Sequence, residues 1–250
     1  MKLQNFIKEI VIISIVLISQ GSVGQVPYER ILNASDEPQN WLTYNGGYMS
    51  QRYSLLDQIN QENVNQLELK WVLQNQVFGA WQSNPIIVDG VMYVTERPNS
   101  VMAVDAVTGR VYWKYRHQNA DNALVCCGAN NRGVAVLNDK VYMGTLDAHL
   151  VALDRVNGQL LWEAEVGDVN RAYSVTMAPL AVKDKILVGV GEVNLEFEAM
   201  WPHSTPKLEN RRGKPTLSRA PVRPIMIVGK VMTGSTAGLL FGLPAHSILI

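Results

Sequence analysis

A repeated phrase limits the folds open to this chain of 250 residues. Ala103–Trp113 reads AVDAVTGRVYW, and Ala152–Trp162 reads ALDRVNGQLLW, 49 residues further on. Each copy predicts a strand, a turn whose glycine takes a positive φ, and a second strand that ends in tryptophan. Asn63–Trp71 (NVNQLELKW) is a weaker, earlier copy. A phrase that returns at a fixed spacing indicates a repeat fold.

A second repeated unit lies between these copies. Asn84–Val94, Gly133–Met143 and Ala178–Val190 each show two apolar strands around a polar tight turn. Joined to the tryptophan phrase, they give a four-strand unit every 45–50 residues, which is the size of a β-propeller blade. The sequence predicts an all-β fold, with three to four propeller blades of four antiparallel strands. The apolar residues are β-branched and hairpin-spaced, which argues against helical repeats. A plain β-sandwich is the alternative architecture.

The net charge of zero hides three unequal parts. Residues 1–24 carry +1, residues 25–192 carry −5 and residues 193–250 carry +4. This balance gives no support for a nucleic-acid partner. The three parts also mark the predicted domains: a signal peptide (1–24), a truncated propeller (25–192) and an aberrant tail (193–250).

The N-terminus has the pattern of an export signal. Lys2 and Lys8 precede the apolar run Ile10–Ile18, and small residues follow in Gly21–Gly24. We expect a periplasmic or secreted protein after cleavage, in an oxidising compartment. The alternative is an uncleaved anchor that leaves the protein membrane-associated, but the run is shorter than the ~20 residues that span a bilayer.

The pattern A-x-D-x-x-T-G-x-x-x-W resembles the blade motif of the PQQ-dependent (quinoprotein) alcohol and methanol dehydrogenases. These are eight-bladed propellers that use pyrroloquinoline quinone (PQQ). Trp41–Trp71 is similar to the opening segment of that family, and the resemblance continues to about Gly191. It implies a partial eight-bladed propeller, with PQQ and Ca²⁺ as cofactors, an alcohol as substrate and a cytochrome as electron acceptor.

The only two cysteines, Cys126 and Cys127, are adjacent in CCGANNRG. The residues alone leave two alternatives open, a pair of buried reduced thiols and a strained bridge between neighbours; export favours the bridge. The resemblance implies a vicinal disulfide that packs flat against the PQQ ring. It also implies that Arg132 binds the cofactor, for which a guanidinium suits the carboxylates. Thr176, in TMAP, matches a threonine that hydrogen-bonds PQQ. The alternatives are an ordinary surface-turn arginine for Arg132 and an ordinary strand threonine for Thr176.

Two further positions depart from the family pattern. Gln82 stands where family members often have Glu, so it can hydrogen-bond the cofactor without adding charge. Glu192 falls near a calcium-binding Glu of the family, in a shortened segment, and a solvated loop carboxylate is the alternative. His117 and His149 have no ligand-like partners in the sequence, which predicts structural roles for both.

The tail from residue 193 breaks the repeat. It is rich in proline and basic residues and has no strand alternation, which predicts an irregular or disordered segment. Val193–Pro202 can be encoded by nucleotides that read EFGIRGNVA in another frame, and the stretch from His203 can encode AFNAKTGE. Both strings resemble the continuation of the family, which suggests a frameshift near residue 192. A genuine basic or membrane-associating module is the alternative.

These patterns lead to one functional hypothesis. The chain is the N-terminal fragment of an exported PQQ- and calcium-dependent alcohol dehydrogenase, which oxidises alcohols to aldehydes. We expect the chain to be inactive alone, because the resemblance places the catalytic Asp in blades beyond residue 192, so no catalytic residue is assigned. A non-enzymatic propeller scaffold of the cell envelope and a short quinone-binding module are the alternatives.

Overall fold

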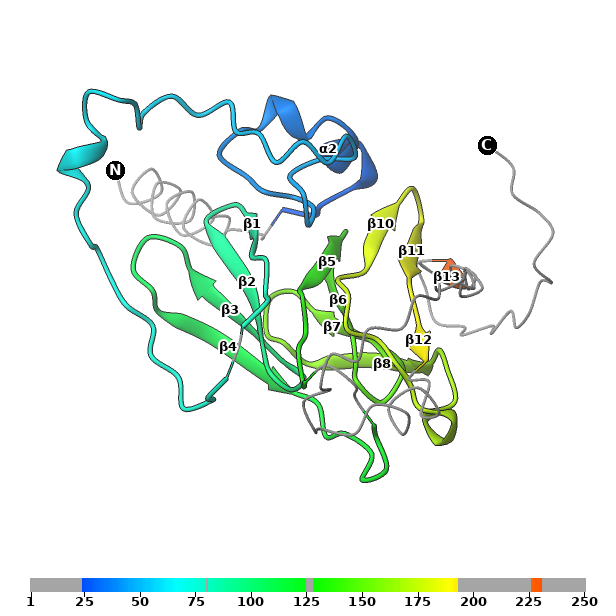
Figure 1. The fold of residues 1–250 in the computed structure, drawn as a ribbon. Coiled ribbons are helices and arrows are strands. Elements are labelled where there is room, and N and C mark those ends of the chain that lie inside the picture. Colours follow the sequence, from blue (N-terminus) through cyan, green and yellow to red (C-terminus); the bar gives the residue numbers. More distant parts are fainter. Residues whose placement is uncertain (1–23, 80, 125–127, 193–225, 231–250) are drawn as a thin grey trace, which may run out of the picture.

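A computed structural model of the protein describes residues 24–79, 81–124, 128–192 and 226–230 (Figure 1). Almost all regular structure in these ranges is antiparallel sheet. The helices are short: α2 is Tyr28–Leu32, and 3-10 turns cover Ala34–Asp36, Val64–Gln66 and Val169–Arg171. Among the described residues, no helix is long and apolar enough to cross a membrane.

The first two sheets are complete four-stranded blades. Each is ordered as in the sequence, β1-β2-β3-β4 and β5-β6-β7-β8, with every neighbouring pair antiparallel. The register slips at the same place in both blades, after Ala103 and after Ala152. The strands of the first blade are Ile86–Val88, Val91–Glu96, Ser100–Asp105 and Val111–Arg116. Those of the second are Val134–Leu137, Lys140–Gly144, His149–Asp154 and Leu160–Glu165.

A third sheet begins another blade. Strands β10 (Leu180–Val182) and β11 (Lys185–Val188) form the predicted hairpin, and β13 (Met226–Lys230) pairs with β11. Two shorter strands, β9 (Tyr173–Ser174) and β12 (Gly191–Glu192), pair separately. Strand β13 belongs to the segment that the sequence predicts to be irregular, but its five described residues form a regular strand.

The structure confirms the all-β propeller prediction and the hairpins that carried it. The segment around Asn63–Trp71 differs, because it contains only a single 3-10 turn and no strand. Figure 1 shows this cyan segment passing around the outside of the β1–β4 sheet. Its Leu67 and Leu69 are 61% and 81% exposed, so these two leucines are not covered by a neighbouring strand.

The tryptophans of the repeat join one blade to the next. Trp71 Nε1 donates to the Ala106 carbonyl oxygen at 3.2 Å, and Trp113 Nε1 donates to the Arg155 carbonyl oxygen at 3.1 Å. The indoles cover Gly109 and Gly158, where a Cβ would overlap the ring. Both glycines have positive φ, +75° and +73°, so the repeat needs glycine there for two reasons.

The core lies within and between the two complete blades. Tyr93 packs against Trp113 and Tyr142 against Trp162, each with ring centroids 5.9 Å apart. The N-terminal segment closes over one end, since Val26 pairs with Asn138 and Trp41 with Ile87. The first strands of successive blades, β1, β5 and β10, lie in contact. Residues just before these strands therefore come together at one edge.

Candidate functional site

Three predicted site residues occupy matching places in three successive blades. Gln82 lies nine residues before Val91, Arg132 nine before Val141 and Thr176 ten before Ile186. In every case the position precedes the first strand of its blade. Because those first strands are in contact, the repeat itself brings the three positions to one edge of the fold.

Arg132 and Thr176 are directly bonded. The backbone N–H of Arg132 donates to the Thr176 carbonyl oxygen at 3.1 Å, and its guanidinium Nη1 donates to the same oxygen at 3.2 Å. The Arg132 carbonyl oxygen accepts from the Asn84 N–H at 3.0 Å. Arg132 therefore links all three blades. This contact uses one of the five N–H donors of the guanidinium.

Gln82 lies in a small polar pocket beside this link. The pocket is lined by Trp81, Gln82, Thr95, Arg97, Asn130 and Asn131. Thr95 and Asn131 form its floor, because both are buried and Thr95 Oγ1 donates to the Asn131 carbonyl oxygen at 3.0 Å. The Asn131 side chain is held in turn by Gly144 at 2.8 Å and Gly133 at 3.1 Å. The floor is therefore fixed by hydrogen bonds that span two blades.

The types of donor at this edge, rather than the size of the pocket, suit a flat, anionic ligand. Arg97 lines the pocket, and Arg132 directly follows the pocket residue Asn131 in the chain, so this edge of the fold carries two arginines. Gln82 and the asparagines add neutral amides, which can both donate and accept. A planar quinone with carboxylates needs cationic forks and amide donors of this kind. Sequence reasoning missed Arg97, which lies 15 residues after Gln82, directly after β2 in the β2–β3 turn.

The remaining predicted site residues are only partly placed. Cys126 and Cys127 lie outside the described residues. The backbone of Glu192 belongs to β12 and pairs with Tyr173, three residues before Thr176. The predicted roles of these residues in cofactor and metal binding remain predictions.

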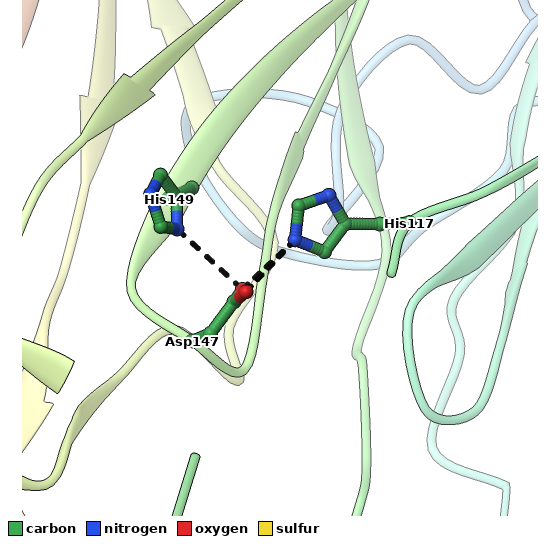
Figure 2. Close-up of side chains that lie close together, drawn as sticks. All are labelled: His117, Asp147 and His149. Atoms are coloured by element: carbon green, nitrogen blue, oxygen red, sulfur yellow. Dashed lines mark hydrogen bonds and ion pairs between the residues drawn. The ribbon is translucent and has the colours of Figure 1, made fainter. Parts of the chain in front are cut away.

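A second polar cluster lies between the two complete blades (Figure 2). His117 follows β4 of the first blade, whereas Asp147 and His149 lie at the β6–β7 turn of the second. His117 Nε2 donates to Asp147 at 3.0 Å, and His149 Nδ1 lies 3.6 Å from Asp147 Oδ1. The structure corrects the expectation that these histidines lack ligand-like partners. His149 lies two residues from Asp147 in the same blade, but His117 lies 30 residues away in the chain and reaches the carboxylate only because the two blades pack together.

Burial and hydrogen bonding compete at this cluster. Burial alone lowers the pKa of His117, but the hydrogen bond and charge of Asp147 outweigh it and raise that pKa. Burial alone raises the pKa of Asp147, but hydrogen bonds from His117, Thr145 Oγ1 and the Ala120 N–H bring it well below its usual range. The carboxylate is therefore ionised at neutral pH.

Taken together, the four-stranded blades and their shared polar edge define a propeller domain of the quinone-binding kind. The family model described as PQQ: Glucose/ethanol/alcohol dehydrogenase, beta-propeller domain matches residues 41–196. The chain belongs to this family, and PQQ with a metal ion is the cofactor set of its dehydrogenases.

Individual relatives agree with this assignment. The chain is 42% identical over 181 residues to the dehydrogenase subunit of the quinone alcohol dehydrogenase of Gluconacetobacter polyoxogenes, which covers 69% of this chain and 24% of the relative. The solved quinohemoprotein alcohol dehydrogenase ADHIIG of Pseudomonas putida is 41% identical, with a TM-score of 0.67 over 69% of this chain and 26% of that one. A europium-containing methanol dehydrogenase is 37% identical, with a TM-score of 0.62 over 66% and 29%. The chain thus spans about a quarter of the length of these relatives.

Proposed function

We propose that this chain supplies the first blades of an exported PQQ-dependent alcohol dehydrogenase, and that these blades carry one side of the cofactor pocket. The observation that carries the proposal is the Arg132–Thr176 link beside Gln82, at matching positions of three blades. A non-enzymatic scaffold needs no such cationic edge. The matched dehydrogenase family supports the enzymatic assignment as well.

In this proposal each residue has a defined task. Arg132 holds a carboxylate of the cofactor, Thr176 orients it with a hydroxyl hydrogen bond, and Gln82 binds it without adding charge. The Cys126–Cys127 disulfide covers one face of the ring. Glu192 contributes a hard oxygen ligand to the metal, for which Ca²⁺ is the candidate. PQQ, when bound, supplies the oxidising quinone that takes two electrons from the alcohol.

The wider setting follows from the same family membership. The substrate is a small alcohol, the product is the aldehyde, and a periplasmic cytochrome receives the electrons. Turnover also needs a general base, which we assign to no residue of this chain. We therefore expect the 250-residue chain to be inactive by itself in dye-linked alcohol oxidation with PQQ and Ca²⁺; measurable turnover would contradict this expectation.

A titration tests the pocket directly. PQQ added in the presence of Ca²⁺ is expected to quench the tryptophan fluorescence of the chain, because Trp81 lines the pocket. Arg132→Ala removes a charge-assisted hydrogen bond worth about 1.5–3 kcal/mol, so it weakens binding by about tenfold or more. Arg110→Ala is the matched control, since Arg110 lies on the exposed β3–β4 turn over Tyr112. Equal affinities of the two variants, or no quenching at all, would remove the basis of the proposal.

A further inference from the structure

The cluster of His117, Asp147 and His149 has the composition of a metal site. One nitrogen from each imidazole and one carboxylate oxygen all lie within 4.8 Å of one another. Two imidazoles with a carboxylate are ligands that suit Zn²⁺ and similar first-row cations. The Ca²⁺ expected at Glu192 calls instead for oxygen ligands, so the two sites would select different metals.

The distances between the ligand atoms suit a tetrahedral ion. Ligand bonds of about 2.0–2.1 Å place tetrahedral ligand atoms about 3.3–3.4 Å apart. The distance from Asp147 is 3.0 Å to His117 Nε2 and 3.6 Å to His149 Nδ1, on either side of that value. The two imidazole rings are tilted by 42° with centroids 6.0 Å apart. Small side-chain rotations would therefore be enough to seat the ion.

His149 carries an observation that points independently to a ligand. Its Nδ1 is a buried atom that has no hydrogen-bond partner among the described residues, and Figure 2 shows it directed toward Asp147. A buried imidazole nitrogen without a partner is unfavourable unless something binds it. A metal ion between His149 and Asp147 would satisfy this nitrogen.

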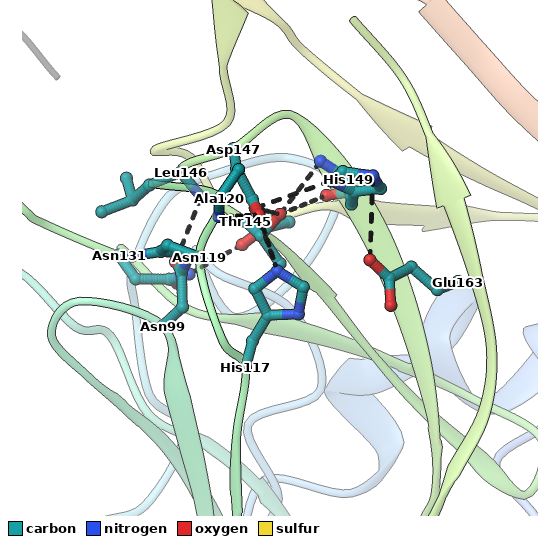
Figure 3. Close-up of polar contacts among 11 residues, drawn as sticks. Asn99, His117, Asn119, Ala120, Asn131, Thr145, Leu146, Asp147, His149 and Glu163 are labelled. Carbon is teal, nitrogen blue, oxygen red and sulfur yellow. Dashed lines mark hydrogen bonds and ion pairs between the residues drawn. The ribbon is translucent and has the colours of Figure 1, made fainter. Parts of the chain in front are cut away.

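The surroundings brace these side chains as outer-shell groups brace metal ligands (Figure 3). Glu163 Oε1 lies 3.8 Å from His149 Nε2, so the ring presents Nδ1 to the cluster and its other nitrogen to a carboxylate. Asp147 accepts from Thr145 Oγ1 at 2.6 Å and from the Ala120 N–H at 2.9 Å. Such carboxylate–histidine–metal arrangements fix the ring and raise its basicity.

The cluster also lies where a metal would join two blades. Asn99, buried in the first blade, accepts from the backbone N–H of His117 at 2.9 Å and, through its side chain, from the Leu146 N–H at 3.2 Å. The two ligand-bearing segments are therefore already held side by side. We propose that His117, Asp147 and His149 form an inter-blade binding site for Zn²⁺ or a similar divalent cation, with the fourth position open to water. This site does not depend on the proposed alcohol dehydrogenase function.

Zinc titration of the chelator-treated 250-residue chain tests the proposal. We expect one equivalent to bind and to raise the thermal midpoint of unfolding. His149→Gln removes one ligand nitrogen from a partly exposed ring whose Nδ1 makes no hydrogen bond, so the variant is expected to fold; it should bind Zn²⁺ at least tenfold more weakly. His117→Ala should do the same, and far-ultraviolet circular dichroism of both variants without metal shows whether the fold is kept.

Two further variants separate this site from other ligands in the chain. Cys126→Ser combined with Cys127→Ser removes both cysteine sulfurs, and it should leave zinc binding unchanged. Glu163→Gln keeps all three ligands but weakens the support of His149, for which a loss of about 10- to 100-fold is expected. X-ray absorption at the zinc edge should show two imidazoles in the wild-type chain and one in His149→Gln. Sulfur ligation, zinc affinity unchanged by both histidine substitutions, or no stoichiometric binding would overturn the proposal.

Discussion

The indole Nε1 of Trp113, in one complete blade, donates a 3.1 Å hydrogen bond to the backbone carbonyl oxygen of Arg155, in the next. The same ring covers Gly158. Trp71 repeats both contacts one blade earlier, on Ala106 and Gly109. The repeated phrase in the sequence is thus the blade-to-blade joint of the fold: the copy Ala103–Trp113 receives the indole of Trp71 and offers Trp113 to the next copy.

This joint predicts a large effect for Gly158→Ala. The added Cβ would overlap the Trp113 indole, and the backbone has a φ of +73°. Overpacking costs about 1–3 kcal/mol and the left-handed backbone about 1–2 kcal/mol, so we expect a loss of about 2–5 kcal/mol in urea unfolding. Gly90→Ala is the control, because Gly90 has a φ of +78° but open space around it. Equal losses for the two variants would show that the indole contact contributes nothing.

The sequence predicts best what depends on local chemistry. Asp89 and Gly90 between two apolar runs predict a tight turn and the β1–β2 hairpin, and the structure confirms this hairpin. Asn63–Trp71 resembles the repeated phrase in sequence, yet it forms no strand. Strand pairing depends on a neighbouring strand, which the residues of this segment do not specify. The cluster around Asp147 depends on packing between blades, so spacing could not reveal it. The family resemblance implies only that Arg132 and Thr176 each bind the cofactor, whereas the structure shows that the Thr176 carbonyl oxygen joins the two residues.

The uncovered segment around Leu69 predicts self-association. Leu67 and Leu69 are largely exposed on a stretch without strand partners, and exposed apolar segments promote association. Replacing both by lysine should shift the chain toward monomer in sedimentation velocity at equal concentration. Val107→Lys with Val156→Lys is the matched control, since both residues are exposed on the tight turns. The idea fails if the control pair lowers association as much as the leucine pair.

The frameshift suggested near residue 192 can be tested in the nucleotide sequence of the gene. The match to the family model ends at residue 196, close to the point where the sequence repeat stops. We expect the nucleotides after codon 192 to encode the EFGIRGNVA and AFNAKTGE strings in another frame. Sequencing the gene across codons 185–250 checks this expectation. Stop codons in that frame near codon 200 would exclude a frameshift and leave the tail as a genuine segment.

The ion pairs of Arg30 lead us to expect that the folded protein loses stability at low pH. The Nη2 of Arg30 lies 2.5 Å from Glu37 Oε2 and 2.7 Å from Asp89 Oδ1, so this side chain ties the N-terminal segment to the β1–β2 turn. Hydrogen bonds from Arg30 lower the pKa of both carboxyl groups in the folded protein, against the opposing effect of burial. In the unfolded chain these values are about 4.3 for Glu and 3.9 for Asp.

The direction of the pH dependence of stability follows from this difference between the folded and unfolded pKa values. The unfolded chain takes up protons before the folded one does, so the stabilisation is complete above about pH 5 and is lost as the pH falls through the unfolded and then the folded pKa values. The free energy of unfolding in urea should therefore decrease between about pH 5 and pH 3. Asp89→Asn should reduce this slope, since asparagine tolerates the φ of 51° at that turn but does not titrate. Asp57→Asn, at an exposed position, should leave the slope as it is. An identical slope in all three proteins would mean that the Arg30–Asp89 ion pair does not contribute to stability.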